Sequence, residues 1–162
     1  MTTATTARTT PDLSYLLDHT SHVLSTQMTA ALAEIGLTVR GYCVLNHAVG
    51  GELTQIELAR LGDMDKTTMV ITMDELEAAG LAERRPAPGD RRARIVVVTE
   101  AGRRVAADGA RIVSGVHGDV LKALPEAERE VFVSALSRLA AGHLATPADS
   151  EQVVRRRRQA HA

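Results

Sequence analysis

The stretch 54–99 constrains the possible fold more than any other part of this 162-residue chain. Apolar residues at three- and four-residue spacing predict a short helix over 55–61 and a second helix over 65–79. Gly62 lies in the tight turn between the two helices, and Gly80 ends the second one. Two helices joined in this way predict a helix-turn-helix.

A β-hairpin is predicted directly after these helices. One strand pattern covers 81–85, and a β-branched pattern covers 94–99. The loop between them contains the turn-forming residues Pro86, Pro88 and Gly89. A hairpin in this position predicts a winged helix-turn-helix, whose second helix suits the major groove of DNA. The wing, over 86–92, suits the phosphate backbone or the adjacent minor groove.

Charge is concentrated at the wing, although the whole chain is nearly neutral. The chain has 19 basic and 20 acidic residues, which argues against a sequence-independent binder of nucleic acid. The segment 84–94 differs because it has five arginines and one acid: Arg84, Arg85, Arg91, Arg92, Arg94 and Asp90. A solvated charge cluster is one interpretation. Because these residues flank a hairpin tip after a helix-turn-helix, we favour contact with DNA.

Helices are also predicted on both sides of this unit. Their patterns cover 12–35, 38–49, 100–124 and, after Pro125, a last segment through residue 143. Three helices have expected N-caps at Thr38, Thr54 and Asp65, and residues 52–53 are expected to add a very short strand to the hairpin. Residues expected to face inward in the helices include Val39, Tyr42, Cys43, Val49, Ile56, Leu58, Leu61, Met69, Met73, Leu76, Val131, Phe132, Leu136 and Leu139. Because long helices flank a small unit, we expect the two ends of the chain to meet and form a dimerisation platform.

The expected fold class is mostly α with a small β-hairpin wing. Residues 37–99 form the DNA-binding lobe, and 11–36 with 100–146 form the helical dimerisation region. Residues 1–10 are expected to be a disordered arm, and 147–162 a basic, disordered tail. The tail contains four consecutive arginines, 155–158, which could add phosphate contacts but are better interpreted as solubilising.

A run near the hairpin carries a family resemblance. Residues 90–102 read DRRARIVVVTEAG, and they follow ELARL and LEAAGLAERRP in the order expected for a helix-turn-helix and its first wing strand. The chain resembles the MarR (multiple antibiotic resistance regulator) family, whose wing signature has the form D-x-R, a strand, then T-x-x-G. Asp90, Arg92, Thr99 and Gly102 fill those places. The resemblance extends over about 13–144.

The resemblance implies a homodimeric transcription factor that responds to a ligand or to redox state and binds a pseudo-palindromic operator. In such regulators an Arg of the wing tip enters the minor groove, which implies that role for Arg92, with Asp90 orienting it and Arg91 as a second contact. Residues implied to contact the DNA backbone are Thr54, Gln55, Thr67 and Thr68. The outward face of the recognition helix, with Lys66, Val70 and Ile71, would contact bases, and Arg85 belongs to the wing.

The recognition helix departs from the family pattern at one point. Many relatives have a polar residue followed by Arg where this chain has Val70 and Ile71. The missing Arg removes a bidentate donor to guanine, whereas an apolar pair can contact thymine methyl groups. In the alternative interpretation the pair lies at the margin of the core and touches no base.

The resemblance also implies an effector pocket near the first, second and fifth helices. Its candidate lining is His19, His22, Arg40, Tyr42, Cys43 and His47. With two Tyr, one Phe and no Trp, the chain offers few aromatic side chains to stack on a planar phenolic ligand. Cys43 could sense peroxide, but a buried apolar role fits its position better. His19 and His22 are one helical turn apart, but nothing nearby completes a metal site.

Other classes of function have less support. The sequence has no phosphate-binding glycine loop, H-E-x-x-H or G-x-S-x-G motif, so we expect neither an enzyme nor a cofactor. No apolar run is long enough for a membrane span, and the single cysteine fits a reducing cytoplasm. A winged-helix protein-interaction module and a transcriptional activator remain the alternatives to a repressor. The expected partners are double-stranded DNA, a second copy of the chain and a small-molecule effector.

Overall fold

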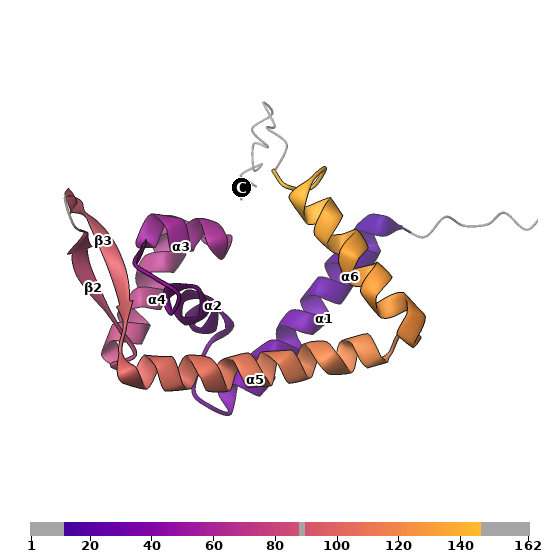
Figure 1. The fold of residues 1–162 in the computed structure, drawn as a ribbon, viewed down its shortest axis with the longest axis horizontal. Helices are drawn as coiled ribbons and strands as arrows, with labels where there is room; N and C mark the ends of the chain where they lie inside the picture. Colours follow the sequence, from indigo (N-terminus) through magenta and orange to yellow (C-terminus); the bar gives the residue numbers. More distant parts are fainter. Residues whose placement is uncertain (1–11, 88–89, 147–162) are drawn as a thin grey trace, which may run out of the picture. The chain divides into compact units, whose positions relative to one another are not determined.

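A computed structural model of the chain describes residues 12–87 and 90–146, so the predicted arm and tail lie outside the described residues. The described part is mostly helical with a small antiparallel sheet, which confirms the predicted fold class (Figure 1). The elements are, in chain order, α1 (Leu13–Ala33), α2 (Val39–Ala48), β1 (Leu53–Thr54), α3 (Gln55–Leu61), α4 (Lys66–Ala78), β2 (Ala82–Ala87), β3 (Asp90–Val98), α5 (Glu100–Lys122) and α6 (Glu126–Ala141).

Side-chain caps begin several helices where the sequence predicted them. Thr38 accepts a hydrogen bond from the amide of Gly41 at 3.0 Å, and Thr54 and Asp65 cap α3 and α4. Two helices end in Schellman turns, in which Gly36 and Gly80 adopt φ values of 68° and 67°. Because these turns start before the glycines, α1 ends at Ala33 rather than at residue 35.

The sheet has the order β1-β3-β2 and is antiparallel throughout. Leu53 pairs with Val96, which confirms the very short strand expected before α3. Ala82 pairs with Val98, and the register shifts after Pro86. Pro86 therefore belongs to β2, and its assignment to the loop was wrong because the hairpin is longer than the β-branched pattern alone indicates.

The winged unit, residues 37–99, has its core between α2, α3, α4 and the sheet, and Leu32 of α1 also packs in this core. Its fully buried side chains include Leu32, Val44, Leu45, Leu58, Met73 and Val96. Met69, Met73 and Leu76 are buried, as predicted for the inner face of α4. Predictions for Val49, Ile56 and Leu61 were wrong, because all three are exposed. Helix α3 has only seven residues and buries a narrow stripe around Leu58, while Val49 is the C-cap of α2.

The start of α5 is bonded to the corner between α4 and β2. The hydroxyl of Thr99 donates to the carbonyl of Gly80 at 2.8 Å and accepts from the amide of Gly102 at 3.0 Å. A Cβ atom at Gly102 would lie 1.9 Å from the carbonyl oxygen of Leu81. The spacing between Thr99 and Gly102 therefore has a physical cause: the threonine caps α5, and only a glycine allows this close approach.

The chain divides into two compact units between Asp119 and Val120. Helix α6, in the second unit, has no buried residue. Its apolar side chains are exposed: Val131, Phe132, Val133, Leu136 and Leu139. The prediction that four of these face inward was therefore wrong for a single chain. Helix α1 also exposes apolar side chains, at Leu13, Tyr15, Leu16 and Val23.

Candidate nucleic-acid interface

The first turn of α3 is fixed by a capping box between Thr54 and Glu57. The amide and hydroxyl of Thr54 both donate to the Glu57 carboxylate at 2.7 Å, and the Glu57 amide donates to the Thr54 hydroxyl at 3.3 Å. The hydrogen bond from the Thr54 amide, supported by that from its hydroxyl, lowers the pKa of Glu57. Both donors of Thr54 are thus engaged within the protein, and the adjacent Gln55 side chain is half-buried.

The first turn of α4 presents a basic and a polar side chain to solvent. Asp65 accepts the amide of Thr68 at 2.8 Å and its hydroxyl at 2.9 Å. The bond from the Thr68 amide is the main reason that the pKa of Asp65 is lowered. Lys66 and Thr67 are exposed beside this cap. The predicted contacts in this turn therefore divide: Thr68 supports the cap, whereas Lys66 and Thr67 are accessible to a ligand.

The outward face of α4 is apolar at its centre. Val70 is 42% exposed and Ile71 is 53% exposed, whereas Met69 and Thr72 on either side are buried. Both side chains are thus accessible from solvent, while contact with thymine methyl groups and the alternative of a position at the margin of the core both remain predictions. Both side chains lie on the surface of the helix that the sequence identifies as the recognition helix. Asp74 is exposed on the same helix.

Arg84 does not belong to the solvent-exposed cluster that its charge suggested. Its guanidinium forms ion pairs with Asp74, at 2.7 Å, and with Glu77, and donates to the carbonyl of Val70 at 3.0 Å. Its backbone amide donates to Glu77 at 2.7 Å. The cluster interpretation was therefore wrong for this residue, because the carboxylates of α4 hold Arg84 against the helix.

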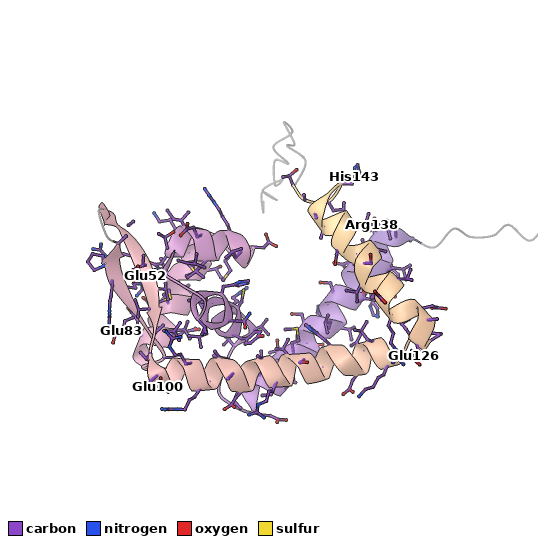
Figure 2. The ribbon with its side chains drawn as sticks, viewed as in Figure 1. Glu52, Glu83, Glu100, Glu126, Arg138 and His143 are labelled. Carbon is purple, nitrogen blue, oxygen red and sulfur yellow. The ribbon has the colours of Figure 1, made fainter. Side chains whose placement is uncertain are left out.

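The wing itself is described only in part. Arg85 lies on β2, is exposed, and pairs with Glu83 at 2.9 Å (Glu83 is labelled in Figure 2). Three residues at the start of β3 are described by their backbone alone, without their side chains: Asp90, Arg91 and Arg92. Their predicted contacts with the minor groove therefore remain predictions.

A hollow of about 550 Å³ lies between α3, α4 and β3. Its lining is largely apolar and includes Ile56, Met64 and Val70. Three basic residues also line it: Arg60, Lys66 and Arg94. Neither Arg60 as a candidate contact nor Ile56 as a surface residue was predicted from the sequence. A seven-residue helix has too few turns to show which face is buried, and this explains both omissions.

The six residues proposed for an effector pocket lie in different surroundings. His19 and His22 are exposed on α1, and the ring of His19 stacks on Tyr15 with a centroid distance of 5.4 Å. Arg40 lines a depression of about 140 Å³ beside α4, together with Thr68 and Ile71. A shared effector pocket lined by these residues therefore remains a prediction.

The remaining candidates lie closer to the core. A Cβ atom at Gly109 of α5 would lie 2.8 Å from the ring of Tyr42, and burial is the main cause of the raised pKa of Tyr42. Cys43 lies beside the turn between α3 and α4, where a Cβ atom at Gly62 would be 3.0 Å from its sulfur. Burial and the nearby Asp63 carboxylate raise the pKa of its thiol. His47 is half-buried in the last turn of α2.

Among the residues that the structure describes, no three His, Cys, Asp or Glu side chains are grouped so that they could hold a metal ion. None of the helices between Leu13 and Ala141 combines the length and hydropathy of a membrane span.

Comparisons with known proteins support the interpretation of this surface. The sequence model of the MarR family matches residues 35–93. A MarR-family transcriptional regulator from Rhodococcus sp. RHA1 is 30% identical, with a TM-score of 0.73; the match covers 80% of this chain and 92% of that one.

A second similar structure is CouR from Rhodococcus jostii RHA1 bound to p-coumaroyl-CoA. It is 29% identical with a TM-score of 0.72, and the match covers 86% of this chain and 96% of that one. A structure of the transcriptional repressor CouR bound to a 23-mer DNA duplex is 27% identical with a TM-score of 0.72, and the match covers 79% and 92% of the two chains.

Proposed function

The chain belongs to the MarR family of transcriptional regulators, and from this premise we propose that it is a homodimeric repressor that binds a pseudo-palindromic operator. In this proposal α4 enters the major groove and the wing reaches the minor groove. Two copies of α4 meet successive major grooves about one helical turn apart.

One observation carries the proposal: the exposed face of α4 is free of core packing and begins with a cation. Lys66, Thr67, Val70 and Ile71 are exposed, while Met69, Met73 and Leu76 anchor the opposite face. Lys66 suits a phosphate, and the apolar pair suits the methyl groups of thymine. Gln55, Thr67 and Arg85 are proposed to contact the backbone, with Arg92, Arg91 and Asp90 at the wing tip. Thr54 and Thr68 would contribute by fixing the helix starts.

Dimerisation is proposed through the helical ends of the chain. Helix α6 exposes five apolar side chains and buries none, and α1 exposes four at its first half. Apolar surface of this extent on a regulator of this family suits contact with a second copy. The two recognition helices would then be held at a fixed separation, as a palindromic operator requires.

A small-molecule effector is proposed to release the repressor. CouR, a similar protein, was found with p-coumaroyl-CoA, and the same protein was found with DNA. A ligand that changes the separation of the recognition helices would weaken operator binding. The CoA thioester is the first compound to test, as a reduction in anisotropy of a labelled protein–DNA complex.

Selection from a random duplex library, followed by anisotropy binding, tests the central proposal. The enriched duplex should bind far more tightly than a scrambled one, with two chains per duplex. Replacing Lys66 by Ala should reduce the slope of log K against log salt by about 0.9, the value for one lost phosphate contact. Glu52→Ala, on the exposed turn before β1, serves as a control that leaves the slope unchanged.

Other results would support the alternatives. No enriched duplex would indicate a winged-helix protein-interaction module. Sequence-specific binding together with increased transcription from a promoter that carries the selected site would indicate an activator. Binding of single chains to the duplex would contradict the dimeric arrangement.

A further inference from the structure

We propose that Arg84 is a positioning residue for DNA recognition, which joins the recognition helix α4 to the wing strand β2 and pairs with two carboxylates of that helix, offsetting one of their two negative charges. This inference rests on the proposed function, because it concerns how the chain presents α4 to DNA. Arg84 is not proposed to touch DNA.

The contacts of Arg84 extend over about two turns on one side of α4. Its guanidinium reaches the carbonyl of Val70 at 3.0 Å, Asp74 at 2.7 Å, and Glu77. Residues at these spacings share one side of a helix. The backbone amide of Arg84 adds a bond to Glu77 at 2.7 Å. One residue of β2 thus contacts α4 at three positions, from Val70 to Glu77.

The direction of the Arg84 side chain supports a role inside the protein. Successive residues of a strand point to opposite faces of the sheet, and Ala82, two positions earlier, is buried. Arg84 therefore shares the inner face with Ala82, and its side chain is only 20% exposed. Arg85 points the other way and is 58% exposed. Of the two neighbours, only Arg85 is accessible to a phosphate.

The bonds of Arg84 resolve a problem of charge on the recognition helix. Asp74 and Glu77 follow Val70 on the same side of α4, and Val70 is one of the proposed base contacts. Unpaired carboxylates at this place would repel the phosphates of DNA. Since one guanidinium pairs with both carboxylates, it offsets one of their two negative charges and so reduces the repulsion between α4 and the duplex.

The same bonds fix the recognition helix relative to the wing. Because α4 is proposed to contact the major groove and the wing the minor groove, their separation must match the DNA. A change in this separation would weaken correct contacts more than sequence-independent ones. We therefore expect Arg84 to contribute to discrimination between operator and other DNA.

The first experiment compares Arg84→Ala with Lys66→Ala in the full-length protein. Each variant is titrated against the duplex selected from the random library and against a scrambled duplex, at several salt concentrations. Arg84→Ala should lower the ratio of the two affinities about tenfold, the effect expected from loss of a charged hydrogen bond. Its salt slope should stay at the wild-type value, whereas Lys66→Ala should lose about 0.9. A loss of slope by Arg84→Ala, or an unchanged ratio, would overturn the proposal.

A double-mutant cycle makes the test independent of the absolute affinities. In a protein with Asp74→Ala and Glu77→Ala, the further change Arg84→Ala should alter the affinity ratio less than about twofold, because both carboxylate partners are already gone and only the bond to the Val70 carbonyl remains to be lost. A residue that contacts DNA directly would cause its full loss in both backgrounds, and that result would contradict the proposal. Circular dichroism and melting temperature serve as controls for folding.

If Arg84→Ala does not fold, the variant Asp74→Ala/Glu77→Ala with Arg84 intact decides the matter. Removal of two negative charges alone would strengthen binding to both duplexes equally, so an unchanged ratio would overturn the proposal. A lower ratio would support it, because the link to the wing is broken. If the wild-type protein selects no duplex, the proposed function fails before any variant is compared, which distinguishes the two failures.

Discussion

The winged unit and the last helix place their apolar side chains in opposite ways. In the winged unit, Leu45, Leu58 and Met73 are almost completely buried, and side-chain caps and ion pairs secure the helices around them. Helix α6 has apolar residues at similar helical spacing, but all remain exposed in a single chain. The comparison indicates that the winged unit contains its own core, while α6 depends on contact with another surface.

Removal of a core side chain from the winged unit should have the largest effect. Leu45 is 0% exposed, so Leu45→Ala should lower the free energy of unfolding by about 2–5 kcal/mol through lost burial and the cavity left behind. Urea unfolding followed by circular dichroism measures this change. The loss should be the same at every protein concentration, because the contacts lie within one chain.

Leu139→Ala on α6 provides the matched comparison. Leu139 is 38% exposed, and its substitution should change how the unfolding midpoint depends on protein concentration, as expected for a dimer contact. An equal, concentration-independent loss in both variants would show that α6 is packed within its own chain and would remove the contrast.

Charge introduced on the apolar side of α6 should separate the chains. Phe132→Asp should raise the dimer dissociation constant at least about tenfold, since large aromatic side chains often dominate such interfaces. Sedimentation velocity measures the change. The winged unit should stay folded, so its thermal transition should persist. A dimer that is as stable as the wild type would contradict the proposed interface.

Arg138→Ala is the control for this experiment. Arg138 lies about 160° around the helix from Leu136 and about 120° from Phe132, so it is off the side of α6 that these two residues share. It is labelled in Figure 2 and is exposed on α6. Its substitution should leave the dimer dissociation constant near the wild-type value.

Sequence patterns predicted those parts of the molecule that depend on local chemistry. Thr38, Thr54 and Asp65 were expected as helix caps and act as caps, because an oxygen acceptor three residues before a free amide is recognisable in sequence. The buried side of α4 was also predictable, since thirteen residues give enough turns to show a stripe.

Features that depend on tertiary contacts were not predicted from the sequence. Arg84 and Arg85 are adjacent and chemically identical, but the register of β2 turns one towards α4 and the other to solvent. The buried Ala82 on the same face, with Asp74 and Glu77 on the preceding helix, was the signal that could have identified Arg84. For α6 the missing information is the second surface, which one chain does not contain.

Acid should weaken the caps of the winged unit. The pKa of Asp65 is lowered by the amide of Thr68, and the pKa of Glu57 by the amide of Thr54. A carboxylate with a lowered folded pKa contributes stability that is present above its unfolded pKa, about 4, and is lost as the pH falls through the folded pKa. Unfolding by urea should therefore become easier below about pH 4.

The variant Asp65→Asn tests this assignment. Asparagine still accepts the Thr68 amide but does not ionise, so the acid-dependent loss of stability should become smaller. Titration of the carboxyl groups by carbon NMR gives the two pKa values directly. A pKa of Asp65 at or above the usual range for aspartate would contradict the hydrogen-bonded cap.

The smallest expected effect concerns Cys43, whose pKa is raised by burial and by the Asp63 carboxylate. A thiol with a raised folded pKa stays protonated near neutral pH, and only the thiolate reacts with alkylating reagents. Iodoacetamide should therefore modify Cys43 in the folded protein more slowly than in urea, and the folded rate should rise at a higher pH than the rate in urea. Any stability that the neutral thiol contributes is complete below the unfolded pKa, about 8.5, and is lost as the pH rises through the folded value.

Asp63→Asn should move the rise in the modification rate of folded Cys43 to lower pH, because it removes the neighbouring negative charge. Rapid modification at pH 7 would instead indicate a reactive thiol, and the winged unit would then contain a redox-sensitive site at the half-buried turn between α3 and α4.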